Sequence, residues 1–381
     1  MRFMSIYTLS LRAVPGNVAR KERSAFRGCS PATVYPRTSF HSSGLRVLRT
    51  LMLLAAAFGA AGAPAFAQET KEVRIVQQFG LSYLPLHVAV EQKLIEKHAR
   101  AAGLNDTKVI LSKLGSGAAA NDALLSGSVD IALGGTTVLM TIWDKTKGGR
   151  GDVKAMMAFC DTPMVITSID PRVKSIRDYR EGDRIAMTAA RGTHHSISLQ
   201  MATAKEFGWD NRARLDNMTV GMSHPDAMIA LLSGSHEVKS HSATVPFLQQ
   251  ELTDPRVHVV LNSYDVAGGR HTLIVAYNTA KWKNENPKTY AAVVAAFEEA
   301  MRFINTDKRA AAEVYSRAEK TRFTVDEVQK MLQDENVIYF SPTPSRVGVW
   351  SDYMHKADML KSPAASWKDY FFENVHGKPG S

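Results

Sequence analysis

The sequence has little cysteine, with only Cys29 and Cys160 in 381 residues. Cys29 falls in an arginine-rich segment that we expect to be removed, which leaves Cys160 alone in the remaining chain. One thiol cannot form an internal disulfide or a cysteine-based zinc cluster. The stability of the protein must therefore come from its core.

Several catalytic sequence patterns are also missing. The chain has no Gly-x-Ser-x-Gly elbow, no His-Glu-x-x-His pair and no phosphate-binding loop. It therefore lacks the sequence motifs typical of serine hydrolases, zinc proteases and nucleoside triphosphatases. A composition with 45% hydrophobic and 22% charged residues is ordinary for a globular protein and excludes a collagen-like rod or a coiled coil. The length indicates two domains, or three.

Acidic residues are scarce in the first 50 positions, which hold nine Lys and Arg residues against Glu22 alone. Of the 47 basic and 37 acidic residues in the chain, 38 and 36 therefore lie after this segment, a net charge of +2. The formal net charge of +10 thus belongs mainly to the N-terminal segment. The rest is nearly neutral, so we expect no nucleic-acid partner.

Residues 51–67, LMLLAAAFGAAGAPAFA, carry no charge, follow Arg46 and Arg49, and end in Ala-Phe-Ala. A basic flank, a short apolar run and small residues at the cleavage positions are typical of a secretory signal peptide. We expect cleavage after Ala67 and a location in the periplasm. A membrane anchor is the alternative, but 17 alanine-rich residues are marginal for a hydrocarbon core about 30 Å thick.

The segment before this signal is unusually long for a signal peptide. One interpretation places the true start codon near Val47. The other treats residues 1–45, rich in Arg and Ser, as an organellar transit peptide. The second interpretation does not explain the Ala-Phe-Ala sequence.

Strand and helix patterns alternate from residue 71 onward, which predicts an α/β fold. The first unit is strand, helix, strand, helix, strand over 71–79, 84–104, 108–114, 118–126 and 129–133, and sequential strands linked by helices are parallel. Further strands are expected at 153–159, 164–169, 184–188, 218–221, 257–261 and 271–277, and helices at 193–207 and 225–232. Residues 279–381 are expected to be mainly helical, with no residues that suggest chemistry.

Three glycine-containing turns follow the first three predicted strands. In open parallel sheets, ligands bind outside the carboxyl ends of the strands, where glycine permits close approach and helix N-termini offer free N–H groups. The alternative is that the turns are only tight connections with helix caps. The candidate ligand-binding residues in these turns are Ser82, Tyr83, Ser116, Gly117, Gly135, Thr136 and Thr137.

Two later segments add candidates. Asp161 follows the strand at 153–159, and Arg191, Thr193 and His194 stand at the start of the helix that follows the strand at 184–188. Thr193 is a plausible N-cap, which places another anion-friendly helix end here. Arg191 could pair with an acidic ligand or be an exposed loop cation. Asp161 could bind an amine or cap a turn.

Four segments give the chain a resemblance to a known family: LPLHVAVEQKLIEKHARAAGL, NDALLSGSVDIALGG, GTHHSISLQMATAKEFGW and PDAMIALLSGSHEVKSHSATVPFLQQ. The chain resembles solute-binding proteins of ABC importers, of the nitrate/sulfonate/taurine class that also includes binders of pyrimidine precursors. The resemblance covers nearly all of the chain after residue 67. Each segment is moderately specific, and their order and spacing are the stronger sign.

The resemblance implies a type II periplasmic-binding-protein-like fold, in which two α/β lobes are joined by two crossing strands and the ligand lies between them. Lobe one would be 68–165 plus 272–381 and lobe two 166–271, with crossings at 164–170 and 272–278. A monomer without a cofactor would close on a small organic anion, a sulfonate or a carboxylate, and deliver it to ABC permease and ATPase subunits. Two short connections suit hinge closure.

Histidine is where the sequence departs from the family, because Ser240-His241-Ser242 stands where the family often has an acidic residue. His241 and Ser242 are candidate ligand contacts, because a histidine can bind an anion when protonated. A metal site is the weaker alternative, because carboxylate partners at fixed spacing are not evident. Of the seven histidines between 194 and 271, we expect most on the surface and at most one of His194 and His195 in the cleft.

The competing class is an enzyme built on the same fold. Pyrimidine-synthesising proteins resemble this family but carry a cysteine-rich run, which this chain lacks. Cys160 is the one candidate for a reactive cysteine, and a buried structural role is the commoner fate of such a residue. We therefore expect a binding protein and no enzyme.

Overall fold

The computed structural model describes residues 69–381 except 150, 235–236, 320 and 363. The predicted signal peptide and the segment before it lie outside the described residues. Within the described part, no helix combines the length and the apolar character needed to cross a membrane.

The first sheet is mixed and five-stranded, in the order β2-β1-β3-β10-β4. Strands β1, β2 and β3 are mutually parallel as the sequence predicts, whereas β10 runs antiparallel between β3 and β4. Most residues of β3, β4 and β10 are buried, so these strands form the centre of the main core. The strands are β1 (Glu72–Gln77), β2 (Lys108–Lys113), β3 (Ile131–Gly135), β4 (Val153–Asp161) and β10 (Thr272–Thr279).

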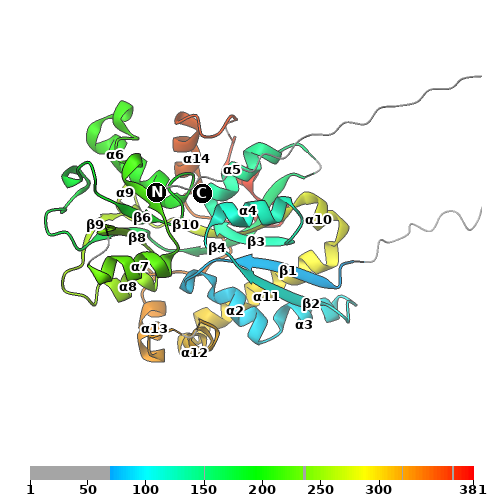
Figure 1. The fold of residues 1–381 in the computed structure, drawn as a ribbon. Helices are drawn as coiled ribbons and strands as arrows, with labels where there is room; N and C mark the ends of the chain where they lie inside the picture. The colour runs from blue at the N-terminus through cyan, green and yellow to red at the C-terminus, as the bar shows by residue number, and fades with distance from the viewer. Residues whose placement is uncertain (1–68, 150, 235–236, 320, 363) are drawn as a thin grey trace, which may run out of the picture. The chain divides into compact units, whose positions relative to one another are not determined.

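Helices cover both faces of this sheet (Figure 1). On one side lie α2 (Leu84–Glu91), α3 (Leu94–Ala101), α11 (Pro287–Thr306) and α12 (Lys308–Glu319), and on the other α4 (Gly117–Leu125) and α5 (Thr136–Thr146). The single helix predicted over 84–104 is two helices, because Lys93 between them is left-handed with φ of 51°. A non-glycine residue in that region ends one helix before the next begins.

The second sheet has the order β7-β6-β8-β5-β9. Its parallel part is β7, β6 and β8, and β5 runs antiparallel to both β8 and β9. The strands are β5 (Val165–Ser168), β6 (Ile185–Met187), β7 (Thr219–Gly221), β8 (Ser240–Ala243) and β9 (His258–Asn262), and the helices are α6 (His194–Phe207), α7 (His224–Ser233), α8 (Phe247–Glu251) and α9 (Ser263–Ala267). Strand β8 is missing from the sequence prediction because its four residues, SHSA, are polar or small.

The chain passes between the sheets twice. It leaves the first sheet at the end of β4, enters the second at β5 after three intervening residues, and returns between α9 and β10. The remaining helices, α10 (Ala280–Glu285), α13 (Val325–Gln333) and α14 (Val347–Lys356), follow this return. As predicted, the chain beyond β10 is mainly helical. The structure also shows that Thr324 caps α13 through a capping box.

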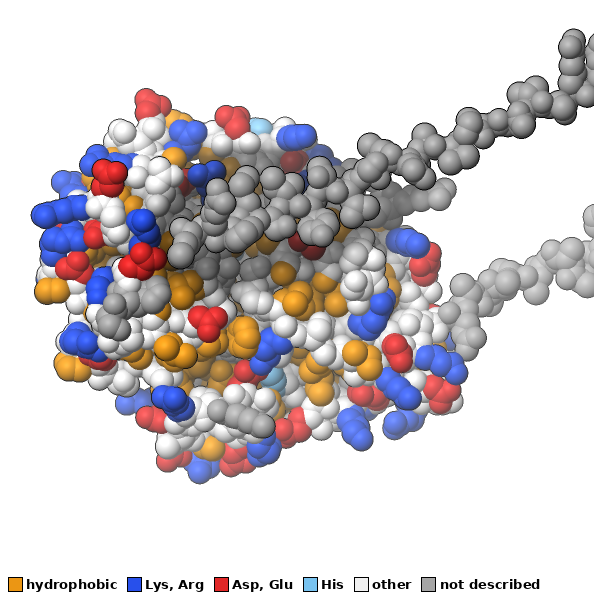
Figure 2. Space-filling view, in the orientation of Figure 1, with side chains coloured by type: hydrophobic (Ala, Val, Ile, Leu, Met, Phe, Trp, Pro, Cys, Tyr) orange, Lys and Arg blue, Asp and Glu red, His pale blue; other side chains and the backbone are white. Residues whose placement is uncertain are grey.

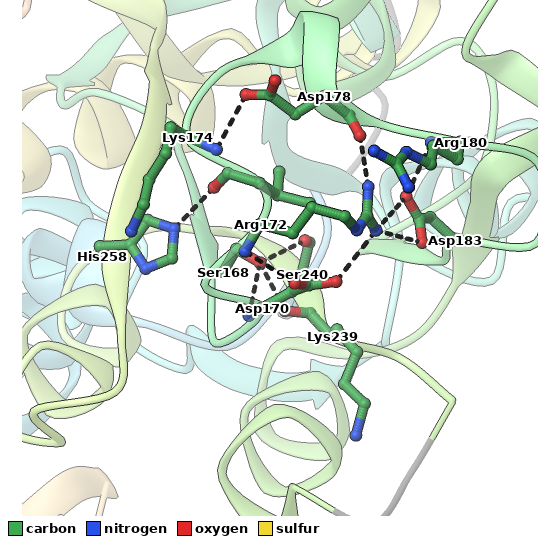
Figure 3. A network of polar contacts seen from close by, with 11 residues as sticks. Ser168, Asp170, Arg172, Lys174, Asp178, Arg180, Asp183, Lys239, Ser240 and His258 are labelled. Carbon is green, nitrogen blue, oxygen red and sulfur yellow. Dashed lines mark hydrogen bonds and ion pairs between the residues drawn. The ribbon is translucent and has the colours of Figure 1, made fainter.

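A network of charged residues fixes the loop that follows β5 (Figure 3). Arg172 donates to Asp170 (2.9 Å) and to both carboxylate oxygens of Asp183 (2.8 Å each). Asp178 accepts hydrogen bonds from the backbone N–H groups of Lys174 and Ser175 (3.0 and 2.8 Å). The carboxylates of Asp170 and Asp183 satisfy the guanidinium of Arg172, so this side chain has a structural role. Figure 2 shows acidic and basic side chains intermixed on the visible face, in keeping with the near-neutral charge after residue 67.

Candidate functional site

A small cavity of about 40 Å³ lies between the two sheets. This is room for on the order of three water molecules. Elements of the first sheet contribute one part of its lining, Gln78, Ser82, Tyr83, Gly117, Gly135, Val138, Leu273 and Ile274. Elements of the second sheet contribute the other, Thr188, Thr193, His194, His195, His224 and Thr244.

Strand ends meet at this cavity. Gln78 follows β1 and Gly135 ends β3, while Thr188 follows β6 and Thr244 follows β8. Since β1 and β3 are parallel, and β6 and β8 are parallel, each sheet presents its carboxyl edge to the cavity. This is the usual place for a ligand in an open α/β sheet.

Four helices begin at the same place. Gly117, Thr136, His194 and His224 are the first residues of α4, α5, α6 and α7, and three of the four line the cavity. The N-terminus of a helix carries a partial positive charge and unpaired N–H groups. Their convergence favours a ligand with negative charge or strong hydrogen-bond acceptors.

The imidazole of His194 contributes a free donor. Its Nδ1 accepts the backbone N–H of Thr137 at 3.3 Å, and burial lowers the pKa of His194 well below its usual value. The neutral ring must then carry its hydrogen on Nε2. That atom is buried and has no hydrogen-bond partner among the described residues, which is costly unless something else accepts from it.

The cavity has no fixed charge of its own. Among the described residues that line it, none is Lys, Arg, Asp or Glu. Burial lowers the pKa of His195 to about 3, and it lowers the pKa of His224 well below its usual value. The histidines of the wall are therefore neutral near pH 7, and the site offers hydrogen bonds and dipoles.

The sequence-predicted candidates fall into three groups. Those that line the cavity are Ser82, Tyr83, Gly117, Gly135, Thr193 and His194. Those directly behind the lining are Ser116, which caps α4, Thr136, whose hydroxyl donates to the carbonyl of Thr272, Thr137, which contacts His194, and His241 and Ser242, which contact His224 and His195. Arg191 and Asp161 form the third group.

Neither Arg191 nor Asp161 lines the cavity. Arg191 is exposed, and its charge acts on Asp216. Asp161 is buried at the end of β4, where it accepts the hydroxyl of Thr272 at 2.8 Å and lies 3.9 Å from Arg270. The backbone between Asp161 and Tyr339 is paired in both directions, so its surroundings are those of a strand connection.

The buried carboxyl of Asp161 should make the stability of the protein depend on pH. Burial raises its pKa to about 6, against about 3.9 in an unfolded chain. Its contribution to stability is therefore complete below about pH 4 and is lost as the pH rises through 6. Between pH 4 and pH 7.5, the free energy of unfolding of the natural protein should fall by on the order of 2 kcal/mol because of this carboxyl. We expect Asp161→Asn to show no such fall, as measured by urea unfolding at both pH values. An equal pH dependence in both proteins would contradict this.

The histidines differ most from expectation. His194, His195, His224, His241 and His271 are all buried, although we expected most of the seven to be exposed. His194 and His195 both line the cavity, against the expectation of at most one. Side chains in the first turn of a helix point back past its N-terminus, so neighbours there can reach the same space.

Several lining residues escaped the sequence analysis, notably Gln78, Thr188, His224 and Thr244. His224 could have been found, because it follows the N-cap Ser223 at a predicted helix start, as His194 follows the N-cap Thr193 of α6. Gln78 falls inside the predicted strand 71–79, and Thr244 follows β8, a strand that the sequence does not predict. Among the described residues, no group of three or more His, Cys, Asp and Glu side chains could hold a metal ion.

Cys160 is fully buried in β4 and does not line the cavity. Burial raises the pKa of its thiol to about 12. A nucleophilic cysteine needs a thiolate near neutral pH, so this residue is poorly suited to covalent chemistry.

Two α/β lobes with a cavity at their facing carboxyl edges define the periplasmic-binding-protein fold, and solved structures agree. The alkanesulfonate-binding protein SsuA from Xanthomonas axonopodis pv. citri, bound to MOPS, is 16% identical with a TM-score of 0.61, covering 78% of this chain and 96% of its own. The nitrate-binding protein NrtA from Synechocystis PCC 6803 is also 16% identical, with a TM-score of 0.60 and coverages of 79% and 84%. At this identity the likeness is one of fold.

The family follows from the sequence itself. Residues 67–318 match the model of the NMT1-like family, and the chain belongs to that family. No curated protein sequence matches the chain.

Proposed function

We propose that the protein is the solute-binding component of an ABC importer and captures a small organic anion, a sulfonate or a carboxylate, between its two lobes. The observation that carries this proposal is the cavity itself, whose lining comes from both lobes and includes the first residues of three helices and residues at four strand ends. The names of the similar structures, an alkanesulfonate-binding and a nitrate-binding protein, support the same ligand class. Export by the predicted signal peptide and delivery to permease and ATPase subunits belong to this proposal.

The mechanism is a change of population. A ligand that touches both lobes binds the closed form better than the open form and so shifts the equilibrium toward closure. Lobe contacts are already present in the structure, where the backbone N–H of Leu81 donates to the carbonyl of Val245 at 3.2 Å. The boundaries 68–165 with 272–381, and 166–271, remain our proposal for the lobes that move.

The size of the cavity limits the ligand. About 40 Å³ between closed lobes accommodates a head group of a few heavy atoms. A larger organic body would need a path out of the cavity. A wider groove of about 750 Å³ lies nearby, lined by residues of both lobes that include Phe79, Met228, Ile229 and Phe247. Figure 2 shows hydrophobic side chains gathered over this region of α7 and α8.

A thermal-shift screen tests the proposal. A ligand bound by the folded state alone, at about 100 times its Kd, stabilises by about 2.7 kcal/mol. We therefore expect a rise in Tm of several degrees with at least one small sulfonate or carboxylate, and no rise with matched uncharged alcohols and amides. No shift with any anion, or a shift with uncharged analogues alone, would contradict the anion proposal.

The enzyme alternative is tested with Cys160→Ser. Because the thiol is buried behind the lining and held protonated, we expect this variant to bind the ligand found in the screen with unchanged affinity. Chromatography of ligand incubated with the purified protein should return it unaltered. Conversion of the ligand by the natural protein, lost in Cys160→Ser, would favour an enzyme.

A further inference from the structure

A line of buried polar groups runs from the interior of the second lobe to the cavity wall. Glu251 Oε1 lies 2.5 Å from His241 Nδ1, and His241 Nε2 lies 2.9 Å from His224 Nδ1. His224 Nε2 in turn lies 3.3 Å from the hydroxyl of Thr244. We call Glu251, His241, His224 and Thr244 the histidine relay. Its last two members line the cavity, and its first two are completely buried.

The inner end of the relay fixes one hydrogen. Glu251 also accepts the hydroxyl of Thr167 on its other oxygen, at 2.7 Å. The short contact between Glu251 and His241 needs a hydrogen between the two heavy atoms, and it is held there whichever of the two carries it. The protonation of His241 Nε2 therefore decides the direction of every later hydrogen bond.

Two arrangements fit these distances. In the first, His241 Nε2 has no hydrogen and accepts from His224 Nδ1, so His224 Nε2 presents a lone pair toward Thr244 and the cavity. In the second, the relay holds one more proton. His241 Nε2 then donates to His224 Nδ1, and His224 Nε2 carries an N–H that donates toward Thr244 and the cavity. The two arrangements differ in one proton and in the polarity that they show to a ligand.

The charge of the relay differs as well. Without the extra proton it holds one net negative charge, on a carboxylate that no solvent reaches. With the proton it is neutral overall, which burial favours because an uncompensated buried charge is costly. An anion in the cavity would favour the same state, since it needs a donor and is repelled by a negative charge behind the wall.

Resting on the function proposed above, we infer that the histidine relay couples anion capture to the uptake of one proton. The protonated relay turns a donor toward the cavity and admits an anion, and the deprotonated relay turns an acceptor toward it and rejects the anion. Glu251, His241 and His224 thereby determine ligand class from behind the contact surface, and Glu251 and His241 act as positioning residues.

The groups around the relay leave few competitors for this proton. From α6, the ring of His195 lies 5.2 Å from that of His224 and bonds Ser242 at 2.8 Å. Phe247 of α8 stacks on the ring of His224. Strand β5 places Thr167 against Glu251, and the residues of β6 are Ile, Ala and Met, so neither strand brings a charged group to the relay. Tyr83 lines the cavity from lobe one, where burial raises its pKa well above its usual value. Since burial lowers the pKa of His195 to about 3, neither neighbour titrates near neutral pH.

The relay itself is tested without any ligand. Nitrogen NMR of protein labelled at histidine reports which ring nitrogen carries hydrogen. In a titration from about pH 5 to pH 8, we expect the two ring nitrogens of His224 to exchange their protonated and unprotonated shifts in one step. Glu251→Gln should abolish that step, whereas Glu285→Gln, at an exposed surface pair, should leave it unchanged. Shifts of His224 that stay constant over this range would overturn the inference, whatever the protein binds.

The coupling is tested with methanesulfonate as the probe. Calorimetric titration in two buffers of different ionisation enthalpy should show close to one proton taken up per anion bound, and affinity should fall about tenfold per pH unit above the transition. Glu251→Gln should remove both effects. Binding that is independent of pH, in a protein whose His224 changes tautomer, would overturn the coupling and leave the solute-binding function. A His224 that changes tautomer in a protein that binds no anion at any pH would overturn the proposed ligand class and the coupling with it.

Discussion

Replacing His241 with leucine is expected to lower the free energy of unfolding by about 3 to 5 kcal/mol. Glu251 is completely buried, and its carboxylate has the imidazole of His241 as its close hydrogen-bonding partner, 2.5 Å away. Without the imidazole, the carboxylate must either stay charged in an apolar environment or take up a proton, and both cost free energy. His224 also loses the partner of its Nδ1. Urea unfolding measures the loss.

A double-mutant cycle separates this cost from simple loss of packing. The variant His241→Leu with Glu251→Leu removes both members of the pair, and such apolar replacements are often close to neutral. We expect the double variant to recover part of the loss, leaving the cost of an unpaired His224. His355→Leu, at an exposed histidine, is the control and should change stability by less than about 0.5 kcal/mol. Additive losses in the cycle would refute the pairing argument.

Replacing Gly135 with valine is expected to weaken ligand binding by about 5- to 150-fold, which corresponds to the 1 to 3 kcal/mol that overpacking typically costs. Gly135 belongs to lobe one, and a Cβ added there would lie 3.2 Å from Nδ1 of His194 in lobe two. Its backbone, with φ of −65° and ψ of 144°, suits any residue. The added Cβ would also meet Leu273 O at 3.8 Å and Val138 Cγ2 at 3.9 Å in lobe one, but these are ordinary contact distances. The penalty should therefore fall mainly on the closed form.

Two measurements distinguish this effect from general damage. Small-angle scattering with saturating ligand should show a more open average conformation for Gly135→Val than for the natural protein. Urea unfolding without ligand should be nearly unchanged. Gly151→Ala is the matched control, since nothing lies within 4 Å of its added Cβ, and it should bind normally. Normal affinity in Gly135→Val would show that the observed lobe contact is not part of the bound state.

The architecture was largely accessible from the sequence because hydrophobic periodicity is strong where it matters. The three parallel strands of the first sheet and the helix behind Thr193 appear where the pattern predicts them. The pattern fails where local chemistry competes with it. Strand β8 is polar because it carries His241 and Ser242 toward the site, and Lys93 breaks a continuous helical pattern with one backbone angle.

The site was accessible only in part. Glycine turns revealed Gly117 and Gly135, because close approach of backbone leaves a visible residue type. No local signal distinguishes Glu251 from the solvated glutamates common on helices, since its burial results from β5 and β8 packing against α8. The prominence of Arg191 and Asp161 had the opposite cause. A charged side chain near a strand or helix end fits the sequence pattern of a binding site. Whether it lines the cavity depends on tertiary partners such as Asp216 and Thr272, which the sequence pattern does not reveal.

The absence of fixed charge from the described cavity lining has a kinetic consequence. Charged clefts accelerate the arrival of oppositely charged molecules, and that acceleration disappears as ionic strength rises. A lining of hydroxyls, amides and neutral imidazoles has no such long-range attraction to lose. Encounter with a small anion should therefore proceed at nearly the same rate in dilute and in concentrated salt, and the time that the lobes spend apart should set its pace.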